Sequence, residues 1–156
     1  MRQTSEQKWQ SDGKCAVAIR PWPSAPHAMK LLLDTHILLW WVEDNQRLPV
    51  RLQKKIASHE GEIFVSAATG WEVVMKAKLG KLPIPPETVP LLRKLITASG
   101  FLELAITLDH ALLAGNLPIE HKDPFDRVII AQAMLEGLTI VSIDKALPRY
   151  RVSVLG

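Results

Sequence analysis

The stretch KLLLDTH occupies residues 30–36 and places three consecutive leucines directly before a carboxylate. An apolar run this short, bounded by polar residues, is typical of a β-strand that is buried on both faces of a parallel sheet. We expect this strand over residues 30–33, with Asp34 at its end. A helical pattern from Ile37 to Val42 follows, so a strand, an acid and a helix succeed one another.

The same alternation continues along the chain. Further strands are expected at residues 62–66, 102–106 and 139–143, with a candidate fifth at 151–155. Helical patterns lie at residues 49–56, 70–79, 87–98, 109–114 and 125–136. Glycines that readily end helices follow several of them, namely Gly80, Gly100, Gly115 and Gly137. The pattern predicts an α/β fold whose mostly parallel sheet is covered by helices on both faces.

The length and composition favour one folded domain. The chain has 156 residues, of which 47% are hydrophobic and 22% charged, as in ordinary globular proteins. Residues 1–28 show no clear period and end in a stretch with three prolines. We therefore expect a flexible N-terminal extension at 1–28 and a domain at 29–156, with Met29 as a candidate natural start of translation.

Charge and cysteine content narrow the class of protein. The net charge is +3, but residues 29–156 hold 15 Lys and Arg against 14 Asp and Glu. Contact with nucleic acid would therefore depend on locally placed cations and on metal ions. The only cysteine is Cys15, and the chain contains neither a long apolar span nor the apolar core of a signal peptide. We expect a cytoplasmic protein that does not insert into membranes.

Four acids are predicted to meet at one edge of the sheet. Asp34 and Asp144 directly follow expected strands, and parallel strands share an edge at their carboxyl ends. Glu72 and Asp126 lie near the starts of helices that the topology returns to that edge. Carboxylates crowded in this way repel one another and need a cation. Mg²⁺ and Mn²⁺ prefer oxygen ligands, so metal-assisted hydrolysis of a phosphodiester is the chemistry that this set favours.

Each acid also has a purely structural interpretation. Asp34 is a candidate helix N-cap, Asp144 could open a turn, and Glu72 in a first helical turn would suit the helix dipole. Asp123 and Asp126 lie on either side of the start of one helix, so a single one of them needs to be a metal ligand. We assign Asp123 as the N-cap and Asp126 as the ligand, with the reverse assignment left open.

Four sequence blocks together resemble the motifs of PIN-domain proteins, and most closely the VapC-type toxins of bacterial toxin–antitoxin pairs. The blocks are residues 31–36 with Leu39-Trp40, residues 65–72 (VSAATGWE), residues 121–127 (HKDPFDR) with Ile130-Ala131-Gln132-Ala133, and residues 141–144 (VSID). The resemblance spans residues 30–155 in the family's order. Thr69 stands where the family often has serine, and residues 1–28 have no counterpart in the family.

This resemblance implies both a fold and a function. The implied fold is a PIN-like α/β/α sandwich with about five parallel strands, and the implied assembly is a homodimer. The implied activity is cleavage of RNA that depends on Mg²⁺ or Mn²⁺, restrained by a cognate antitoxin protein. The family's acids fall on Asp34, Glu72, Asp126 and Asp144. Two alternatives stay open: a housekeeping PIN nuclease in RNA maturation, and a non-catalytic PIN-like binding module.

A few other residues have two interpretations each. Lys76 could contact substrate phosphate or form an ion pair with Glu72, four residues earlier on the same helix face. Arg127 could bind phosphate or lie on the surface. Trp40 and Trp41 point in different directions from their helix, so we expect one to cover the sheet and the other to face a partner.

Overall fold

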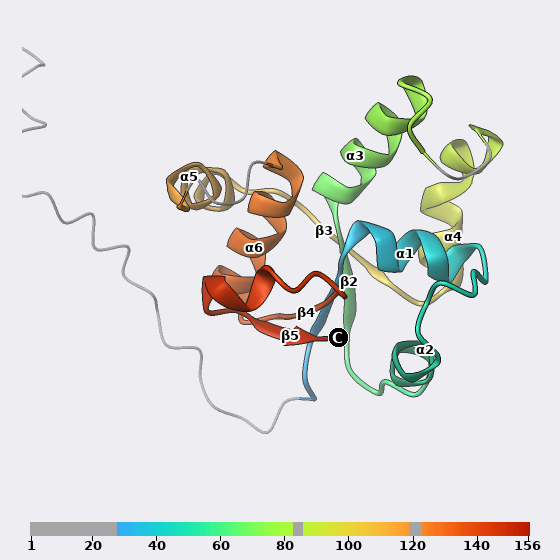
Figure 1. The fold of residues 1–156 in the computed structure, drawn as a ribbon, viewed down its shortest axis with the longest axis horizontal. Helices are drawn as coiled ribbons and strands as arrows, with labels where there is room; N and C mark the ends of the chain where they lie inside the picture. The colour runs from blue at the N-terminus through green and yellow to red at the C-terminus, as the bar shows by residue number, and fades with distance from the viewer. Residues whose placement is uncertain (1–27, 83–85, 119–122) are drawn as a thin grey trace, which may run out of the picture.

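The computed structural model describes residues 28–82, 86–118 and 123–156, so most of the expected N-terminal extension lies outside the described residues. One parallel sheet forms the centre of this part of the chain, in the order β3-β2-β1-β4-β5 (Figure 1). Its strands are β1 Leu31–Leu33, β2 Ile63–Ser66, β3 Leu102–Leu104, β4 Thr139–Val141 and β5 Ser153–Leu155. The predicted α/β fold is confirmed, including the fifth strand.

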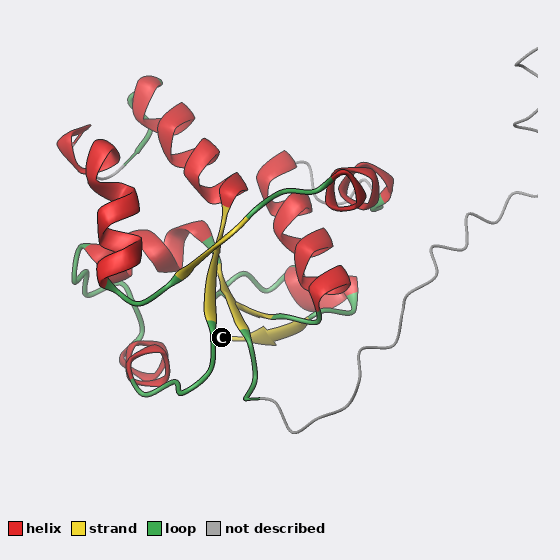
Figure 2. Cartoon of the chain, turned by 180° about the vertical axis from the view of Figure 1, so that it is seen from behind, coloured by secondary structure: helices red, strands yellow, loops and turns green. Residues whose placement is uncertain are grey.

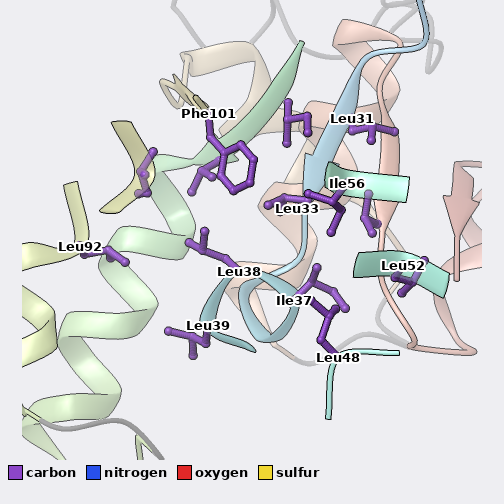
Figure 3. Close-up of a cluster of buried hydrophobic side chains, with 14 of the residues drawn as sticks. Leu31, Leu33, Ile37, Leu38, Leu39, Leu48, Leu52, Ile56, Leu92 and Phe101 are labelled. Carbon is purple, nitrogen blue, oxygen red and sulfur yellow. The ribbon is translucent and has the colours of Figure 1, made fainter. Parts of the chain in front are cut away.

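The central strand β1 is buried on both faces, as its unbroken leucine run predicts. Leu31 and Leu33 belong to one hydrophobic cluster and Leu32 to the other, because successive side chains of a strand point to opposite faces. Figure 3 shows the first cluster, in which Leu33 lies close to side chains of the helices that follow. All three leucines have no exposed surface, so a polar residue here would destabilise both layers.

Helices cover the two faces of the sheet. Their bounds are α1 Thr35–Val42, α2 Val50–Ala57, α3 Ala67–Lys78, α4 Leu92–Ala98, α5 Leu108–Asn116 and α6 Pro124–Glu136, with short 3₁₀ helices η2 Pro86–Leu91 and η3 Leu147–Tyr150. Figures 1 and 2 show α1 to α4 on one side of the sheet and α5 with α6 on the other. This three-layer arrangement is the predicted sandwich.

Several predicted boundaries were wrong for identifiable reasons. The helix expected at 87–98 is divided, because Pro90 has no amide hydrogen and disfavours a continuous α-helix, so η2 precedes α4. Helix α5 passes through Gly115 and ends at Asn116. By contrast, Gly137 ends α6 as expected, with a φ of +66° that suits glycine.

Two further boundary differences affect the candidate site. Helix α3 begins at Ala67 instead of residue 70, because the side chain of Ser66 caps it by accepting a hydrogen bond from the Ala68 N–H. Strand β4 ends at Val141, before the expected residue 143.

Among the described residues, no helix combines the length and the apolar character that crossing a membrane requires.

Candidate active site

All four predicted acids line one pocket at the carboxyl edge of the sheet. The pocket has a volume of about 400 Å³, and we call it the acid pocket. It is bordered by Asp34, His36, Trp40, Glu72, Lys76, Asp123, Asp126, Ile143 and Asp144. It lies where β1 and β4 end and where α1, α3 and α6 begin, and Figure 1 shows these elements meeting above the sheet. The predicted convergence is therefore present in the fold.

Asp34 occupies the N-cap position of α1 but does not use its side chain as a cap. Instead, the hydroxyl of Ser142 donates a hydrogen bond to Asp34 Oδ2 at 2.6 Å. Burial raises the pKa of Asp34 above its usual value, against the opposing effects of the Ser142 hydrogen bond and the nearby His36. The capping interpretation of this carboxylate is thus wrong, and the group is held facing the pocket.

Glu72 is buried in the second turn of α3, with 2% of its surface exposed. Because α3 begins three residues earlier than predicted, an interpretation based on the first turn and the helix dipole does not apply. Thr35 Oγ1 lies 2.5 Å from Glu72 Oε2 and 3.2 Å from Thr69 Oγ1. A hydroxyl has a single proton, so Thr35 donates to Glu72 and accepts from Thr69. Lys76 pairs with the other carboxylate oxygen, Oε1.

Asp123 and Asp126 have the contrasting environments that their positions predict. Asp123 caps α6, since its Oδ1 accepts a hydrogen bond from the Phe125 N–H at 2.9 Å. Asp126 lies one turn further into the helix. Burial and then the charges of Asp123, Asp34, Glu72 and Asp144 raise the pKa of Asp126 to about 7. The mutual repulsion expected of crowded carboxylates is therefore concentrated on Asp126.

Asp144 stabilises a turn and also lines the acid pocket. Its Oδ1 accepts a hydrogen bond from the Ala146 N–H at 2.8 Å, which is the turn predicted for it. Its own N–H donates to Ser142 Oγ at 3.0 Å, and Ser142 in turn holds Asp34. The hydroxyl of Ser142 thus connects Asp34, which follows β1, with the backbone of Asp144, which follows β4. The bond to Asp144 also stabilises the turn after β4.

Three hydroxyl residues were present in the quoted motifs without a predicted role as supports of the acids: Thr35, Thr69 and Ser142. All three are buried, with at most 2% of their surface exposed. A hydroxyl next to an acid at the end of a buried strand was the available signal, because buried polar side chains need hydrogen-bond partners.

Arg127 fits neither of its predicted interpretations. Its guanidinium donates to the carbonyl oxygens of four residues at and beyond the C-terminal end of α5: Ala114, Gly115, Leu117 and Pro118. A helix leaves its last carbonyls without partners, and a cation there also suits the helix dipole. Arg127 therefore joins α6 to α5. Of the same motif, His121 and Lys122 lie outside the described residues.

The two tryptophans of α1 take different positions, as predicted. Trp41 packs on Phe101 with ring centroids 5.7 Å apart, and its Nε1 donates to Ser99 Oγ at 3.1 Å. Trp40 lines the acid pocket beside His36, at a centroid distance of 6.1 Å. Both rings pack against the hydrophobic cluster that contains Leu31 and Leu33, so the expectation that only one of them covers the sheet is wrong. Trp40 also borders the acid pocket, where it is available to molecules that enter.

The donor set of the acid pocket fits a hard divalent cation. It consists of carboxylates, and burial together with their mutual repulsion raises the pKa of Asp126. Within the described part of the chain, no three His, Cys, Asp or Glu side chains converge closely enough to bind one ion directly. Mg²⁺ does not require this, since it commonly keeps several waters and takes one or two protein carboxylates.

Solved structures of similar fold include toxin–antitoxin complexes. VapBC2 from Rickettsia felis bound to a DNA fragment from its promoter has a TM-score of 0.60 at 18% identity and covers 81% of this chain and 98% of that one. A toxin–antitoxin complex from Klebsiella pneumoniae has a TM-score of 0.56 at 21% identity, with coverage of 81% and 96%. At these identities the likeness supports the fold alone.

Sequence comparisons establish the family. Ribonuclease VapC22 of Mycobacterium tuberculosis (strain ATCC 25618 / H37Rv) is 30% identical over 122 residues, which are 78% of this chain and 92% of that protein. The sequence pattern that defines the PIN domain matches residues 31–152, from β1 to the residue before β5. This span contains all four predicted acids and the hydroxyl residues that hold them. The chain belongs to the PIN-domain family.

Proposed function

We propose that this chain is a metal-dependent endoribonuclease that hydrolyses RNA phosphodiester bonds and acts as the toxin of a toxin–antitoxin pair. The observation that carries the proposal is the convergence of Asp34, Glu72, Asp126 and Asp144 on one pocket in a PIN-domain chain. The similarity to a protein named as a VapC ribonuclease supports the same reaction. Burial of Glu72 in the second turn of α3 is not explained by helix capping, which counts against a binding module whose acids are only caps.

In this proposal the four acids together hold Mg²⁺, or Mn²⁺ in its place, with one or two of them as direct ligands and the others acting through the waters that the ion keeps. A bound divalent ion supplies an activated water and stabilises the charge that develops on the scissile phosphate. Ser142 keeps Asp34 facing the pocket, and Thr35 orients Glu72. Asp126 holds a proton below about pH 7 when no cation is near, and releases it when one is. Asp123 serves α6 as its cap.

The proposed partners are RNA, a cognate antitoxin and a second copy of this chain. Trp40 lines the acid pocket, where an aromatic ring can stack on a base. Helix α3 leaves Trp71, Val74 and Met75 exposed, an apolar surface of the kind that association covers. Antitoxin complexes among the structures of similar fold support the protein partner. The proposed substrate and partner belong in the cytoplasm, and the proposed nuclease domain spans residues 29–156.

Cleavage of RNA by the purified chain tests the reaction. Wild-type protein should cut RNA in Mg²⁺ and stop in EDTA, whereas Asp34→Asn should be inactive under both conditions. Glu60→Gln is a matched control, because Glu60 is an exposed acid just before β2, at the opposite edge of the sheet. Metal-independent cleavage, or none at all by well-folded wild type, would remove the proposed activity.

Growth measurements separate a toxin from a housekeeping nuclease. Expression of the wild-type chain alone should arrest bacterial growth, and expression of Asp34→Asn should not. Co-expression of the reading frame directly upstream should restore growth if that frame encodes the antitoxin. Harmless expression of an active ribonuclease would favour the housekeeping alternative.

A further inference from the structure

Lys76 is a cation placed inside the acid pocket. Of the described residues that line this pocket, it is the one lysine, and none is an arginine. Its ammonium pairs with Glu72 Oε1 across one turn of α3. The Lys76 side chain is 31% exposed, whereas that of Glu72 is 3% exposed. The buried carboxylate is thus neutralised by a cation that reaches it from the solvent side.

The electrostatic surroundings of Lys76 extend beyond this pair. Burial alone would lower the pKa of Lys76, but the hydrogen bond and charge of Glu72, with further contributions from Asp123 and Asp126, raise it above its usual value. The ammonium therefore interacts with carboxylates on α3 and on the start of α6. These include Glu72 and Asp126, two of the acids that the proposed function assigns to a metal ion.

Both oxygens of Glu72 already have partners in this structure, Lys76 on Oε1 and Thr35 on Oε2. Each oxygen keeps a second lone pair, but a divalent ion bound there would be repelled by the Lys76 ammonium and not by the uncharged Thr35 hydroxyl. Thr35 is 2% exposed and fixed by its bond to Thr69, whereas Lys76 has a flexible four-carbon stem and access to water. Lys76 is therefore the partner that can leave.

We propose that Lys76 is the built-in counter-cation of the metal-free site, and that a divalent ion binds by displacing its ammonium from Glu72. This inference rests on the proposed function, since it assumes that the acid pocket takes a metal ion. Lys76 then has two effects. It limits the repulsion among the acids before the ion arrives, and it weakens the affinity for the ion, because a positive charge is already present.

Mn²⁺ titration of the full chain by isothermal calorimetry, without RNA, tests the proposal. Lys76→Gln is the informative variant, because its amide can still donate to Glu72 but carries no charge. We expect it to bind Mn²⁺ roughly five- to tenfold more tightly than wild type, as removal of one nearby cation predicts. Lys76→Arg, which keeps the charge, should stay within about twofold of wild type on the same grounds.

Lys78→Gln is the matched control. It removes the same charge from an exposed position of α3 that lies about 200° around the helix from Lys76. Its affinity for Mn²⁺ should equal that of wild type. An increase as large as that of Lys76→Gln would mean that overall charge, and not the displaced ammonium, sets the affinity, and this would overturn the proposal.

A second measurement uses wild-type protein and does not depend on a variant folding. The side-chain ammonium of Lys76, observed by NMR, should lose the signature of its pair with Glu72 as Mg²⁺ is added, with the same midpoint as metal binding. An unchanged ammonium signal at saturating Mg²⁺ overturns the proposal.

The outcomes separate this inference from the proposed function. If wild type binds no Mn²⁺ and has no metal-dependent activity, both fail. If wild type binds Mn²⁺ and Lys76→Gln binds it no more tightly, this inference alone fails. Reduced binding of RNA by Lys76→Gln, with unchanged affinity for Mn²⁺, would instead identify Lys76 as a phosphate contact and would also overturn the proposal.

Discussion

The acid pocket and the junction between α5 and α6 are both polar clusters within the fold. They differ in how far hydrogen-bond donors are matched by acceptors and positive charges by negative ones. At the junction, Arg127 gives its donors to four carbonyl oxygens at the end of α5. His110, which is buried, accepts a hydrogen bond from the Thr107 N–H on Nδ1 and donates from Nε2 to Glu136. Arg127 and His110 thus have complementary partners, which is the arrangement that stabilises a fold.

The acid pocket instead gathers like charges. Four predicted ligands and Asp123 share one cavity with a single lysine. Burial, and then the charges of these acids, raise the pKa of Asp126 to about 7. An arrangement that disfavours its own charged state is typical of a functional site. The comparison teaches that two kinds of polar cluster can be told apart by their charges. A cluster whose charges are matched stabilises the fold, whereas a cluster of like charges is a candidate binding site for a ligand of opposite charge.

The largest effect should come from Asp34→Asn. The substitution keeps the shape and an acceptor for Ser142 but removes a charge that the proposed metal ion needs. We expect the rate of RNA cleavage to fall by about 1,000-fold or more, as losing several kcal/mol of stabilisation predicts. The free energy of unfolding without metal should not fall, because burial already raises the pKa of Asp34. If the variant lost both activity and stability, Asp34 would be a residue that stabilises the fold, and the difference between the two clusters would not hold.

Asp126→Asn and Asp123→Asn form a pair that sharpens the comparison within one helix turn. Asp126→Asn should lose about 100-fold or more in metal-dependent rate, since it removes a proposed ligand. Asp123→Asn should retain most of the activity and stability, because asparagine is an equally good N-cap. Rates in Mg²⁺ and melting temperatures of both variants decide the matter, and the reverse pattern would make Asp123 the third ligand.

Arg127→Met should have the opposite profile. It removes donors to four carbonyl oxygens at the end of α5, so we expect a loss of about 2 kcal/mol in stability. For a chain of this size the melting temperature would fall by roughly 5 °C. The rate of cleavage per folded molecule should stay near that of wild type. A large loss of rate without a change in melting temperature would instead support the interpretation that Arg127 binds substrate phosphate.

The smallest expected effect is a pH dependence of stability in the absence of metal. A folded-state pKa of about 7 for Asp126 lies above the usual value, so the folded state favours the protonated acid. This contribution is fully present below about pH 4 and is lost as the pH rises through about 7. Urea denaturation in EDTA at pH 5 and pH 8 should show a smaller difference for Asp126→Asn than for wild type. Equal differences would mean that Asp126 is not the group that bears the repulsion.

Much of the fold could be predicted because buried segments have recognisable patterns of apolar residues in the sequence. The run Leu31-Leu32-Leu33 predicted a strand covered on both faces, and parallel topology then brought Asp34 and Asp144 to one edge. The cap at Asp123 was predictable as well, because it depends on neighbouring residues.

The remaining features depend on contacts between distant residues. The role of Arg127 requires the end of α5, and that of Ser142 requires Asp34, which lies 108 residues away in the sequence. Hydrogen bonds of this kind leave no local pattern. The start of α3 was missed for a different reason, because Ser66 both ends β2 and caps the helix, so no loop separates them.

The position of β4 in the sheet has a consequence for the protein during its synthesis. Strand β4 pairs with β1 between the earlier strands and β5, and it carries Ser142 and Asp144 to the acid that follows β1. A chain emerging from the ribosome therefore has β1, β2 and β3 available well before the last part of the acid pocket exists. Under the proposed function, a nascent chain of this topology would therefore be unable to cleave RNA, the message it is translated from included, until Asp144 has been made.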